Sequence, residues 1–556
     1  MSRQGPRGRM LETVKTFTAL SEEFVELYFR HHPVRATEAG IHDYDHTLPN
    51  DSPDGIKDRA VWLRDLEQRL VASVPWRELP VEHRVDYAVL RSRIAALRSD
   101  LEEIKTYQRN PVIYPQTALD GIFRLLAYPF APLEDRKESI LARMLAVPDY
   151  LQLVRPNLQT VPDQWLGLAA DLTLSAPGYV DEVGRQLMRS FPGENERIEH
   201  AVSRARQGFL QYQQFIDGEL ERKVGGTFAI GERWMNFKLE RELLLDHDCR
   251  ALESLGREHI ERATRALEAE AQVLDPGRTW QDLVARGRRR HPEAPRLREA
   301  YAAEIELARR FVQEKRLVPL PVGEKLAVID TPVFRRTISP IAAHIPQAAF
   351  DDDLGGIMEV TPIDTARRKE DQIAQLELHH YSAISAIVAN LAYPGQHVQS
   401  CWAHRAGSRL RRATRSHLLV TGWALYCEDL MLEHGFFLDP HAKLFHLRDL
   451  LWRACRVVVD VGLQTGRMTF MQAVDFLADN ALMPRATALS EVKHYTLVPT
   501  QPLGYLVGKL AIQEIRSEVE RRLGARFDLS DFHHRLLSCG AIPPNLIRQE
   551  LHDTLV

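Results

Sequence analysis

The sequence predicts a mainly α-helical protein with a small β element. Apolar residues recur at three- and four-residue spacing along most of the chain, which is the pattern of amphipathic helices. Runs of β-like composition are short and are confined to residues 326–361. At 556 residues the chain exceeds the usual size of one hydrophobic core, so we expect a single large helical domain, 1–556, with two lobes.

In the N-terminal half, each expected helix is an amphipathic segment bounded by polar or helix-breaking residues. The expected ranges are 10–31, 54–74, 81–108, 133–155, 178–191, 195–223 and 239–272. The stretch 273–293 contains Pro276, Gly277 and a basic run, and it is the best candidate for a lobe boundary. It would separate an N-terminal helical lobe, 1–275, from a C-terminal lobe, 294–556.

The C-terminal half is expected to begin with a helix at 294–316, which prolines from Pro319 onward terminate. The short runs Leu326 to Ile329 and Gly356 to Val360 should form a small sheet near the functional cleft. Further helices are expected at 365–391, 404–434, 441–464, 469–482, 485–495, 502–522 and 530–538. Gly504 and Gly508 are four residues apart, which predicts a close helix crossing.

Composition favours a globular protein without a polyanionic partner. Hydrophobic residues make up 44% of the chain and charged residues 27%. The net charge is −4, from 72 basic and 76 acidic residues, so the whole chain has no basic excess. The arginine-rich stretches 286–290 and 409–415 are interpreted as solvated surfaces, and we expect no nucleic-acid partner.

Two further patterns bear on location in the cell. No stretch approaches 18 apolar residues, and no apolar core of signal-peptide length follows the basic N-terminus, so we expect neither a membrane span nor a membrane partner. The five cysteines are odd in number, scattered, and form no CxxC pair. That usage indicates free thiols in a reducing compartment and predicts a cytoplasmic protein.

The most informative segment is 390–399, which reads Asn-Leu-Ala-Tyr-Pro-Gly-Gln-His-Val-Gln. It ends an expected helix, and an acidic residue, Glu428, follows on a later helix. This arrangement resembles the frame of a zinc peptidase. Such a site needs His-Glu at its first two positions, the imidazole to bind the metal and the carboxylate to accept a proton from its water. Here those positions are Asn390 and Leu391.

Landmarks along most of the chain resemble those of one bacterial family, domain of unknown function 885. Its usual signature is His-Glu-x-x-Pro-Gly-His-His-x-x-Gln or close to it. Further matching segments are Pro33 to Gly40, Val360 to Pro362, Gly422 to Glu428, Arg453 to Arg456, Val459 to Leu463 and Tyr505 to Gly508. The resemblance implies a large helical, metallopeptidase-like fold related to thermolysin, with no established substrate.

Carrying the family's site over position by position shows what has changed. The first metal-binding His falls on Asn390, the catalytic Glu on Leu391 and the first of the paired histidines on Gln396. The second paired histidine is retained as His397, and the third ligand as Glu428. Because amides are poor zinc ligands and leucine cannot act as a base, we expect no metal and no cofactor. If the family geometry holds, Asn390, His397 and Glu428 should converge.

The candidate site residues follow from this frame. The proposed acid/base or catalytic residues are His397, Glu428, Tyr495 and His494; the proposed substrate-binding residues are Asn390, Gln396, Gln399, Tyr426, Gln501 and Tyr505. Each also has a structural interpretation, in which Glu428 pairs with Arg453 or Arg456 and the tyrosines brace the helices. Cys401, four residues after His397 and three before His404, is a further candidate for a Cys–His nucleophile.

Three functions stay open from the sequence. The favoured one is a metal-independent enzyme that performs hydrolysis, acyl transfer or cyclisation on a peptide-like or acyl small molecule, for example in specialised metabolism. The first alternative is a non-catalytic pseudo-peptidase that binds a peptide or partner in its helical cleft. The second is a weak metallopeptidase in which a residue such as His404 or His379 substitutes for a lost ligand. The sequence does not set the oligomeric state.

Overall fold

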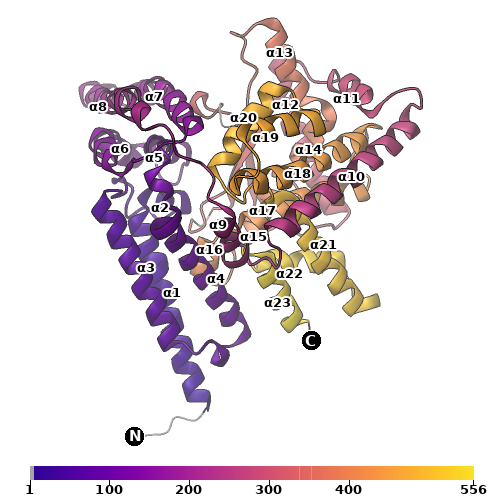
Figure 1. The fold of residues 1–556 in the computed structure, drawn as a ribbon, viewed down its shortest axis with the longest axis horizontal. Coiled ribbons are helices and arrows are strands. Elements are labelled where there is room, and N and C mark those ends of the chain that lie inside the picture. Colours follow the sequence, from indigo (N-terminus) through magenta and orange to yellow (C-terminus); the bar gives the residue numbers. More distant parts are fainter. Residues whose placement is uncertain (1–5, 337–338, 352, 556) are drawn as a thin grey trace. The chain divides into compact units, whose positions relative to one another are not determined.

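Helices dominate the computed structural model, which describes residues 6–336, 339–351 and 353–555 (Figure 1). The predicted mainly α-helical class with a small sheet is therefore confirmed. The chain forms two compact units. Unit 1 contains residues 1–228 and 348–351, and unit 2 contains residues 229–347 and 352–556. The first passage between units thus lies at Phe228–Ala229, whereas the sequence pattern placed a lobe boundary at 273–293.

Unit 1 is built from helices that pack mainly against helices close to them in the chain. In Figure 1, α1 and α3 lie side by side, and α8 packs against both α6 and α7. Its helices are α1 (Pro6–His31), α2 (Pro33–Ala39), α3 (Pro53–Ser73), α4 (Val81–Ser99), α5 (Ile113–Ala127), α6 (Leu133–Leu153), α7 (Asp163–Ser190) and α8 (Asn195–Phe215). A π turn, η2 (Asp100–Ile104), and a 3₁₀ turn, η3 (Thr106–Gln108), follow α4.

Unit 2 carries the motif segment and most of the later helices. Its helices are α9 (Glu232–Phe237), α10 (Cys249–Leu274), α11 (Trp280–Arg288), α12 (Leu297–Glu314), α13 (Lys369–Leu376), α14 (Tyr381–Leu391), α15 (Gln396–His404), α16 (Arg409–Ala413), α17 (His417–Glu433), α18 (Ala442–Gln464), α19 (Phe470–Asn480), α20 (Arg485–Leu497), α21 (Gly504–Leu523), α22 (Leu529–Ser538) and α23 (Pro544–Thr554). The most extensive pairings are α17 with α21 and α10 with α18, and Figure 1 shows the second as two long adjacent helices.

The small sheet of unit 2 has three strands in the order β1-β3-β2. They are β1 (Lys325–Asp330), β2 (Ala342–Ile345) and β3 (Gly355–Val360). The central strand β3 pairs parallel with β1 and antiparallel with β2. Both expected β-like runs are therefore strands, and β2 completes the sheet between them in sequence.

Three helices that the sequence pattern did not predict have identifiable causes. Helix α5 is apolar on average and has no exposed residue, so no fully solvent-facing side contrasts with its buried one. Helices α2 and α23 are short and begin with proline, whose fixed φ suits a first turn. The expected helix at 178–191 in fact begins at Asp163 and runs through Pro177 as α7. Proline inside a helix was taken as a break, and here it is tolerated.

Some expected long helices are interrupted, because local side chains begin new helices. The range 365–391 divides into α13 and α14, where the His380 ring accepts a hydrogen bond from the Ala383 N–H at the start of α14. The range 404–434 divides into α16 and α17, where the Ser408 hydroxyl accepts from the Arg411 N–H. The boundary candidate 273–293 contains α11, which Thr279 opens with a capping box.

Helices α17 and α21 cross at glycines, as the spacing of Gly504 and Gly508 predicts. A Cβ atom at Gly422 of α17 would lie 2.5 Å from the Cα of Gly508 on α21. A Cβ at Gly508 would collide with the Leu418 carbonyl oxygen. At Gly504 it would lie 2.9 Å from the Thr421 hydroxyl. Only glycine permits this separation of the two backbones.

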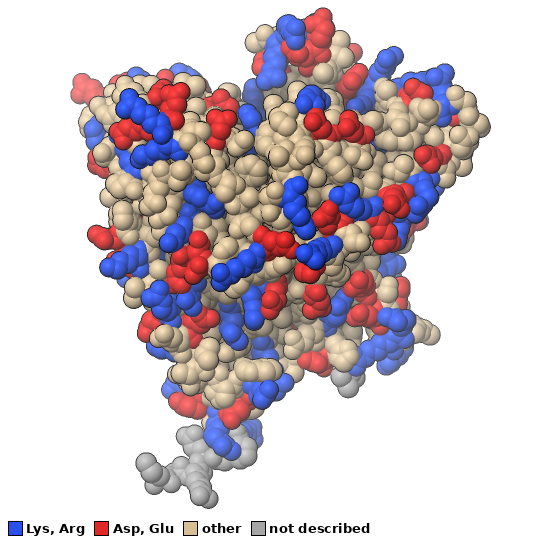
Figure 2. Space-filling view, viewed as in Figure 1, with Lys and Arg blue, Asp and Glu red and all other residues tan. Residues whose placement is uncertain are grey.

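The surface carries charges of both signs, and the cysteines lie in the interior. Basic and acidic side chains are interspersed on the face shown in Figure 2. All five cysteines are buried and free. Among the described residues, no helix is both long and apolar enough to span a bilayer.

Candidate functional site

Asn390 and Glu428 meet in the interior of unit 2. Asn390 lies in the last turn of α14 and Glu428 lies on α17, and both side chains are buried. The Asn390 Nδ2 donates a hydrogen bond of 2.6 Å to the Glu428 Oε1. An amide N–H, rather than a cation, thus satisfies this oxygen of the carboxylate.

The second oxygen of Glu428 faces a buried histidine on α18. Glu428 Oε2 has no hydrogen bond and lies 3.5 Å from the Nδ1 of His446. The other ring nitrogen of His446 donates to Asp429 at 2.7 Å, and Lys509 Nζ approaches the same carboxylate at 2.6 Å. Burial alone would lower the pKa of His446, but Asp429 and Glu428 raise it to about 9. Glu428 therefore has His446 as its positive neighbour, not Arg453 or Arg456 as considered from the sequence.

His397 does not join Glu428. From α15 its Nε2 lies 3.2 Å from the Oε2 of Glu324, the residue before β1. The Tyr393 hydroxyl donates to the same oxygen, and Arg309 Nε donates to the other at 2.8 Å. Burial alone would raise the pKa of Glu324, but hydrogen bonds led by that from His397 lower it. The expected convergence therefore brings Asn390 to Glu428 and fails for His397.

The Cys–His candidate is enclosed with this pair. The Sγ of Cys401 lies 3.9 Å from each ring nitrogen of His397, and both side chains are inaccessible to solvent. Burial and the charge of Glu324 raise the pKa of Cys401 to about 12. Since the thiolate is the reactive form, Cys401 is a neutral packing residue at physiological pH.

The side chains present do not fit a zinc ion. Asn390 turns its NH₂ group, rather than its oxygen, toward Glu428, and His397 is bonded to Glu324. His379, a possible substitute ligand, is buried and hydrogen-bonded to Tyr301, and burial lowers its pKa to about 4. Within the described ranges, no three His, Cys, Asp or Glu side chains form a group that could hold a metal. These side chains therefore do not support a zinc-dependent reaction.

A polar stripe on α18 connects the predicted site residues. Polar side chains recur along this helix at three- and four-residue spacing, which confines them to an arc of about 80°. The stripe consists of His446, Asp449, Arg453, Arg456, Asp460 and Gln464. His446 contacts Glu428 at one end, and Gln464 donates to the Tyr495 carbonyl at 3.2 Å at the other. One helix face thus contacts three of the predicted site residues, Glu428, Tyr495 and Tyr505.

Arg453 and Arg456 are the unusual members of this stripe, because aromatic rings lie against both guanidinium groups and, among the described residues, neither forms a salt bridge with a carboxylate. The Cζ of Arg453 lies 4.2 Å from the ring centroids of both Trp452 and Tyr505. The Cζ of Arg456 lies 5.0 Å from the ring of Tyr495 and 4.8 Å from that of Tyr505. Arg456 is only 8% exposed, and the Nε atoms of both arginines are buried without a hydrogen-bond acceptor.

The acidic groups nearest Arg456 do not neutralise the pair. Glu491 accepts a hydrogen bond of 2.6 Å from the Tyr495 hydroxyl. Asp460 is fully buried, and although backbone N–H groups including that of Thr500 oppose the shift, burial raises its pKa to about 8. Asp460 is therefore mainly protonated at neutral pH. Glu491 and Asp460 thus contribute only to the electrostatic surroundings of Arg456.

The other predicted site residues have more ordinary surroundings. The Tyr426 hydroxyl donates to His533 Nε2 at 2.8 Å, because His533 Nδ1 donates to the Leu317 carbonyl. Tyr426 is buried, which raises the pKa of its hydroxyl and suits a bracing role. Gln396 and Gln399 are buried on α15, whereas His494 is exposed and Gln501 is half-buried.

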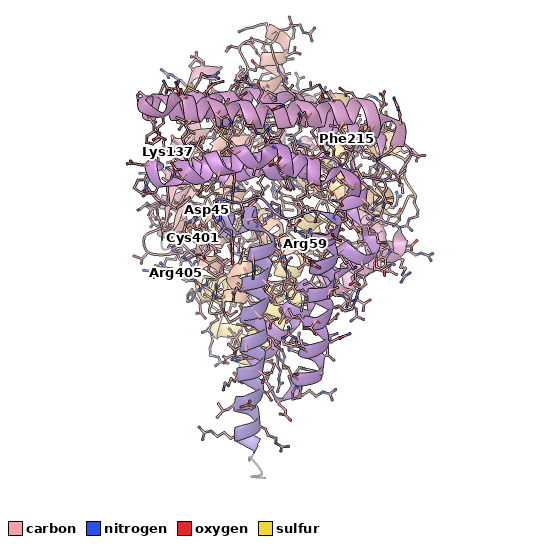
Figure 3. The ribbon with its side chains drawn as sticks, turned by 90° about the vertical axis from the view of Figure 1, so that its left-hand side faces the viewer. Asp45, Arg59, Lys137, Phe215, Cys401 and Arg405 are labelled. Atoms are coloured by element: carbon pink, nitrogen blue, oxygen red, sulfur yellow. The ribbon has the colours of Figure 1, made fainter. Side chains whose placement is uncertain are left out.

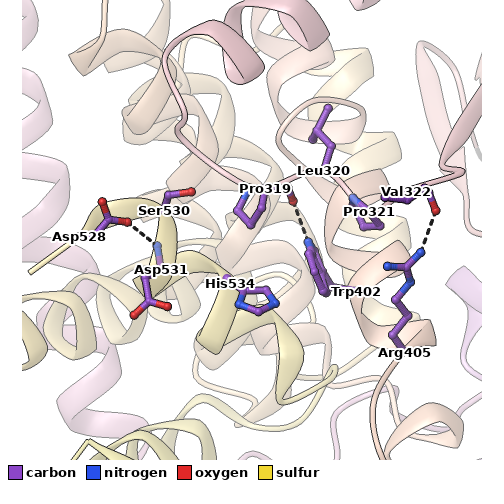
Figure 4. Close-up of a pocket in the computed structure, with 10 residues that line it drawn as sticks. All are labelled: Pro319, Leu320, Pro321, Val322, Trp402, Arg405, Asp528, Ser530, Asp531 and His534. Carbon is purple, nitrogen blue, oxygen red and sulfur yellow. Dashed lines mark hydrogen bonds between the residues drawn. The ribbon is translucent and has the colours of Figure 1, made fainter.

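An open pocket lies at the other end of α15. It has a volume of about 340 Å³ and is lined by Pro319, Leu320, Pro321, Val322, Trp402, Arg405, Asp528, Ser530, Asp531 and His534 (Figure 4). Trp402 and Arg405 donate to carbonyls of the 319–322 segment, as Figure 4 shows. None of the predicted site residues lines this pocket.

Sequence reasoning missed the partners that define the geometry. Glu324 is 73 positions from His397, and no local pattern links the two. His446 could have been found, because it belongs with Arg453 and Arg456 to a set of polar residues at helical spacing in an otherwise apolar segment of α18. That signal marks a buried polar face.

Comparisons with known proteins identify the family and the fold. The profile of a family described as "Bacterial protein of unknown function (DUF885)" matches residues 33–551. A candidate lipoprotein of unknown function from Shewanella oneidensis has a TM-score of 0.78 at 22% identity, covering 96% of this chain and 99% of that one. A candidate lipoprotein from Colwellia psychrerythraea has a TM-score of 0.84 at 17% identity, covering 98% and 99%. These likenesses show the fold alone. A search of curated proteins found no match.

Proposed function

The chain belongs to the bacterial protein family of unknown function DUF885, and we propose that it binds an anionic, peptide-like ligand without zinc chemistry. In this proposal the protein is a pseudo-peptidase, and the free carboxylate of a peptide is the group it recognises. The metallopeptidase-like character of the fold and the loss of the zinc motif are part of the same proposal.

The observation that supports it is the unpaired arginine pair of α18. A buried guanidinium without a carboxylate is costly, and proteins normally pair it. Here aromatic rings flank Arg453 and Arg456, and cation–π contact offsets part of that cost. Guanidinium groups bind carboxylates through two parallel hydrogen bonds, which makes a carboxylate the matching ligand.

The chemistry of the surrounding side chains favours binding over turnover. The two groups proposed as acid and base, His397 and Glu428, have different partners and do not act on a common atom. The flanking rings of Trp452 and Tyr505 offer apolar surface next to the cations. A cation next to apolar surface suits the C-terminal residue of a peptide, because its carboxylate lies beside its side chain.

The test is calorimetric titration with unblocked Ala-Ala-Phe and with its C-terminal amide. The proposal expects the free acid to bind and the amide to bind at least tenfold more weakly. Arg456→Gln should reduce the affinity for the free acid about 10- to 100-fold, since a charged hydrogen bond contributes roughly 1.5–3 kcal/mol. Lys443→Gln, on an exposed position of the same helix, should leave the affinity unchanged.

Three other outcomes would overturn this proposal. Equal affinity for the acid and the amide would show that the arginines do not recognise the C-terminal carboxylate. Cleavage or acyl transfer of the peptide in the presence of a chelator, seen by mass spectrometry, would favour the metal-independent enzyme. Stoichiometric zinc binding abolished by both His397→Ala and Glu428→Ala would restore the metallopeptidase.

Cytoplasmic location is a further part of the proposal. The five buried free cysteines support a reducing compartment. Fractionation of the native bacterium with an antibody tests this, and recovery in the membrane or periplasmic fraction would contradict it.

A further inference from the structure

Unit 1 contains a partly enclosed pocket that no part of the proposed function uses. Its volume is about 170 Å³. It is lined by His32, Asp51, Ile56, Arg59, Trp62, Leu63, Leu97, Asp100, Leu101, Tyr107, Ile113, Tyr114 and Thr117. An engineered apolar cavity of about 150 Å³ is large enough to bind benzene, so this pocket has room for one aromatic ring with a small substituent.

Two buried hydrogen-bond donors in its wall have no acceptor. Arg59 and Trp62 lie three residues apart on one face of α3, and Figure 3 marks Arg59 on that helix. The Nε of Arg59 and the Nε1 of Trp62 are both buried without a hydrogen-bond partner. Arg59 itself is only 6% exposed. A buried unpaired donor costs about 1–3 kcal/mol, so two in one cavity wall indicate a missing acceptor.

The charges of the wall exclude an anion as the best ligand. Arg59 is already paired with Asp51, and the distance from its Nη2 to the Asp51 Oδ1 is 2.7 Å. Asp100, on η2, adds a second carboxylate, which accepts a hydrogen bond from Thr106. Burial lowers the pKa of His32 to about 3, with Arg59 adding to the shift, so His32 is neutral. One positive and two negative charges line the pocket.

The rest of the wall is apolar. Ile56, Leu63, Leu97, Leu101 and Ile113 contribute aliphatic surface, and Tyr107 and Tyr114 contribute rings. The Tyr114 hydroxyl is already used, because it donates to the Tyr107 carbonyl and accepts from Asn157. The buried donors of the pocket wall that still lack an acceptor are therefore the two on α3.

We propose that unit 1 binds a small uncharged molecule with an apolar body and a carbonyl oxygen that accepts hydrogen bonds from Arg59 Nε and Trp62 Nε1. A carbonyl oxygen has two lone pairs and can accept from both N–H groups. The site is independent of the arginine pair of α18, which lies in unit 2.

Benzamide, benzoate and toluene separate the possible ligand classes, since they share one ring and differ in the acceptor. Binding is measured on ¹⁵N-labelled full-length protein by the shift of indole N–H signals during titration. Benzamide should move the Trp62 indole signal and bind at least fivefold more tightly than toluene or benzoate. Trp62→Phe keeps the ring and removes the donor, and it should weaken benzamide about three- to tenfold.

Trp76→Phe is the matched control, because Trp76 is 45% exposed in unit 1 and lies outside the pocket wall. It should leave benzamide affinity unchanged. A second variant, Leu101→Phe, adds volume to the wall and should abolish binding. The proposal is overturned if benzamide fails to bind at millimolar concentration, which would mean that water alone occupies the cavity. It is equally overturned if benzoate binds more tightly, or if Trp62→Phe behaves like Trp76→Phe.

Discussion

Glu324 and Arg456 are both buried charges of unit 2, and their surroundings differ in one respect. Glu324 receives hydrogen bonds from His397, Tyr393 and Arg309, so every oxygen of its carboxylate is satisfied. Arg456 has the faces of Trp452, Tyr495 and Tyr505 around it, and its Nε is buried without an acceptor. A fully paired buried charge stabilises a fold, whereas an unpaired one is retained where another molecule supplies the partner.

The largest expected effect concerns stability. Glu324→Gln removes the charge that three donors share, and breaking a buried pair costs about 3–5 kcal/mol. Arg456→Gln removes no pairing, so we expect it to change the free energy of unfolding by less than about 1 kcal/mol. Urea unfolding of both variants measures the difference. Glu306→Gln, at an exposed position of α12, is the control. Equal destabilisation by the first two variants would remove the contrast.

The second effect is a pH dependence of stability from His446. Its folded pKa of about 9 lies above the ordinary value of 6.5, so its protonation stabilises the folded state. That contribution is complete below pH 6.5 and is lost as the pH rises from 6.5 to 9. The loss is on the order of 3 kcal/mol for a shift of this size. His446→Gln should flatten the curve of unfolding free energy against pH in that window, and an unchanged curve would contradict the assignment.

A smaller effect should appear in ligand affinity as Asp460 ionises. Asp460 contributes to the electrostatic surroundings of Arg456, and its pKa is about 8. Above pH 8 its charge competes with a bound carboxylate, so affinity for the free peptide should fall about three- to tenfold between pH 7 and pH 9. Titration of Asp460→Asn over the same range should show no such fall. A fall of the same size in the variant would assign it to another group.

The smallest effect is expected at Cys401. Because its thiol is buried and protonated, Cys401→Ala should leave peptide binding unchanged and cost about 1 kcal/mol of stability from lost packing. A thiol reagent at pH 8 should label the unfolded protein at this position and spare the folded one. Rapid labelling of folded protein at Cys401 would reopen the nucleophile hypothesis.

The spacing of apolar residues predicted the helices well where one face is buried and the other is exposed to solvent. It failed for α5, which has no exposed residue, and for α7, which continues through Pro177. Breaks inside 365–391 and 404–434 depend on capping by His380 and Ser408, which is visible only once the chain is folded. These are tertiary and local effects that hydrophobic spacing does not encode.

For the site, the motif placed Asn390 and Glu428 near each other, and the structure joins them by a hydrogen bond. It could not place His397, because the preference of His397 for Glu324 depends on a residue far away in sequence. It also left the arginines as partners of Glu428, whereas Arg453 and Arg456 face rings contributed by α18, α20 and α21. A pairing between residues far apart in sequence leaves no local pattern. The polar stripe of α18, in contrast, follows the helical period and is visible in the spacing of its residues.

The glycine crossing of α17 and α21 also governs how the interior opens. With Gly422 against Gly508, neither helix can separate from the other without exposing backbone that is otherwise in direct contact. The amide hydrogens on either side of this contact should therefore exchange with deuterium in a single cooperative event, at the slow rate set by opening of the whole region. Glu428 and Lys509 lie on these two helices, so we expect the amides around both residues to belong to this slowly exchanging group.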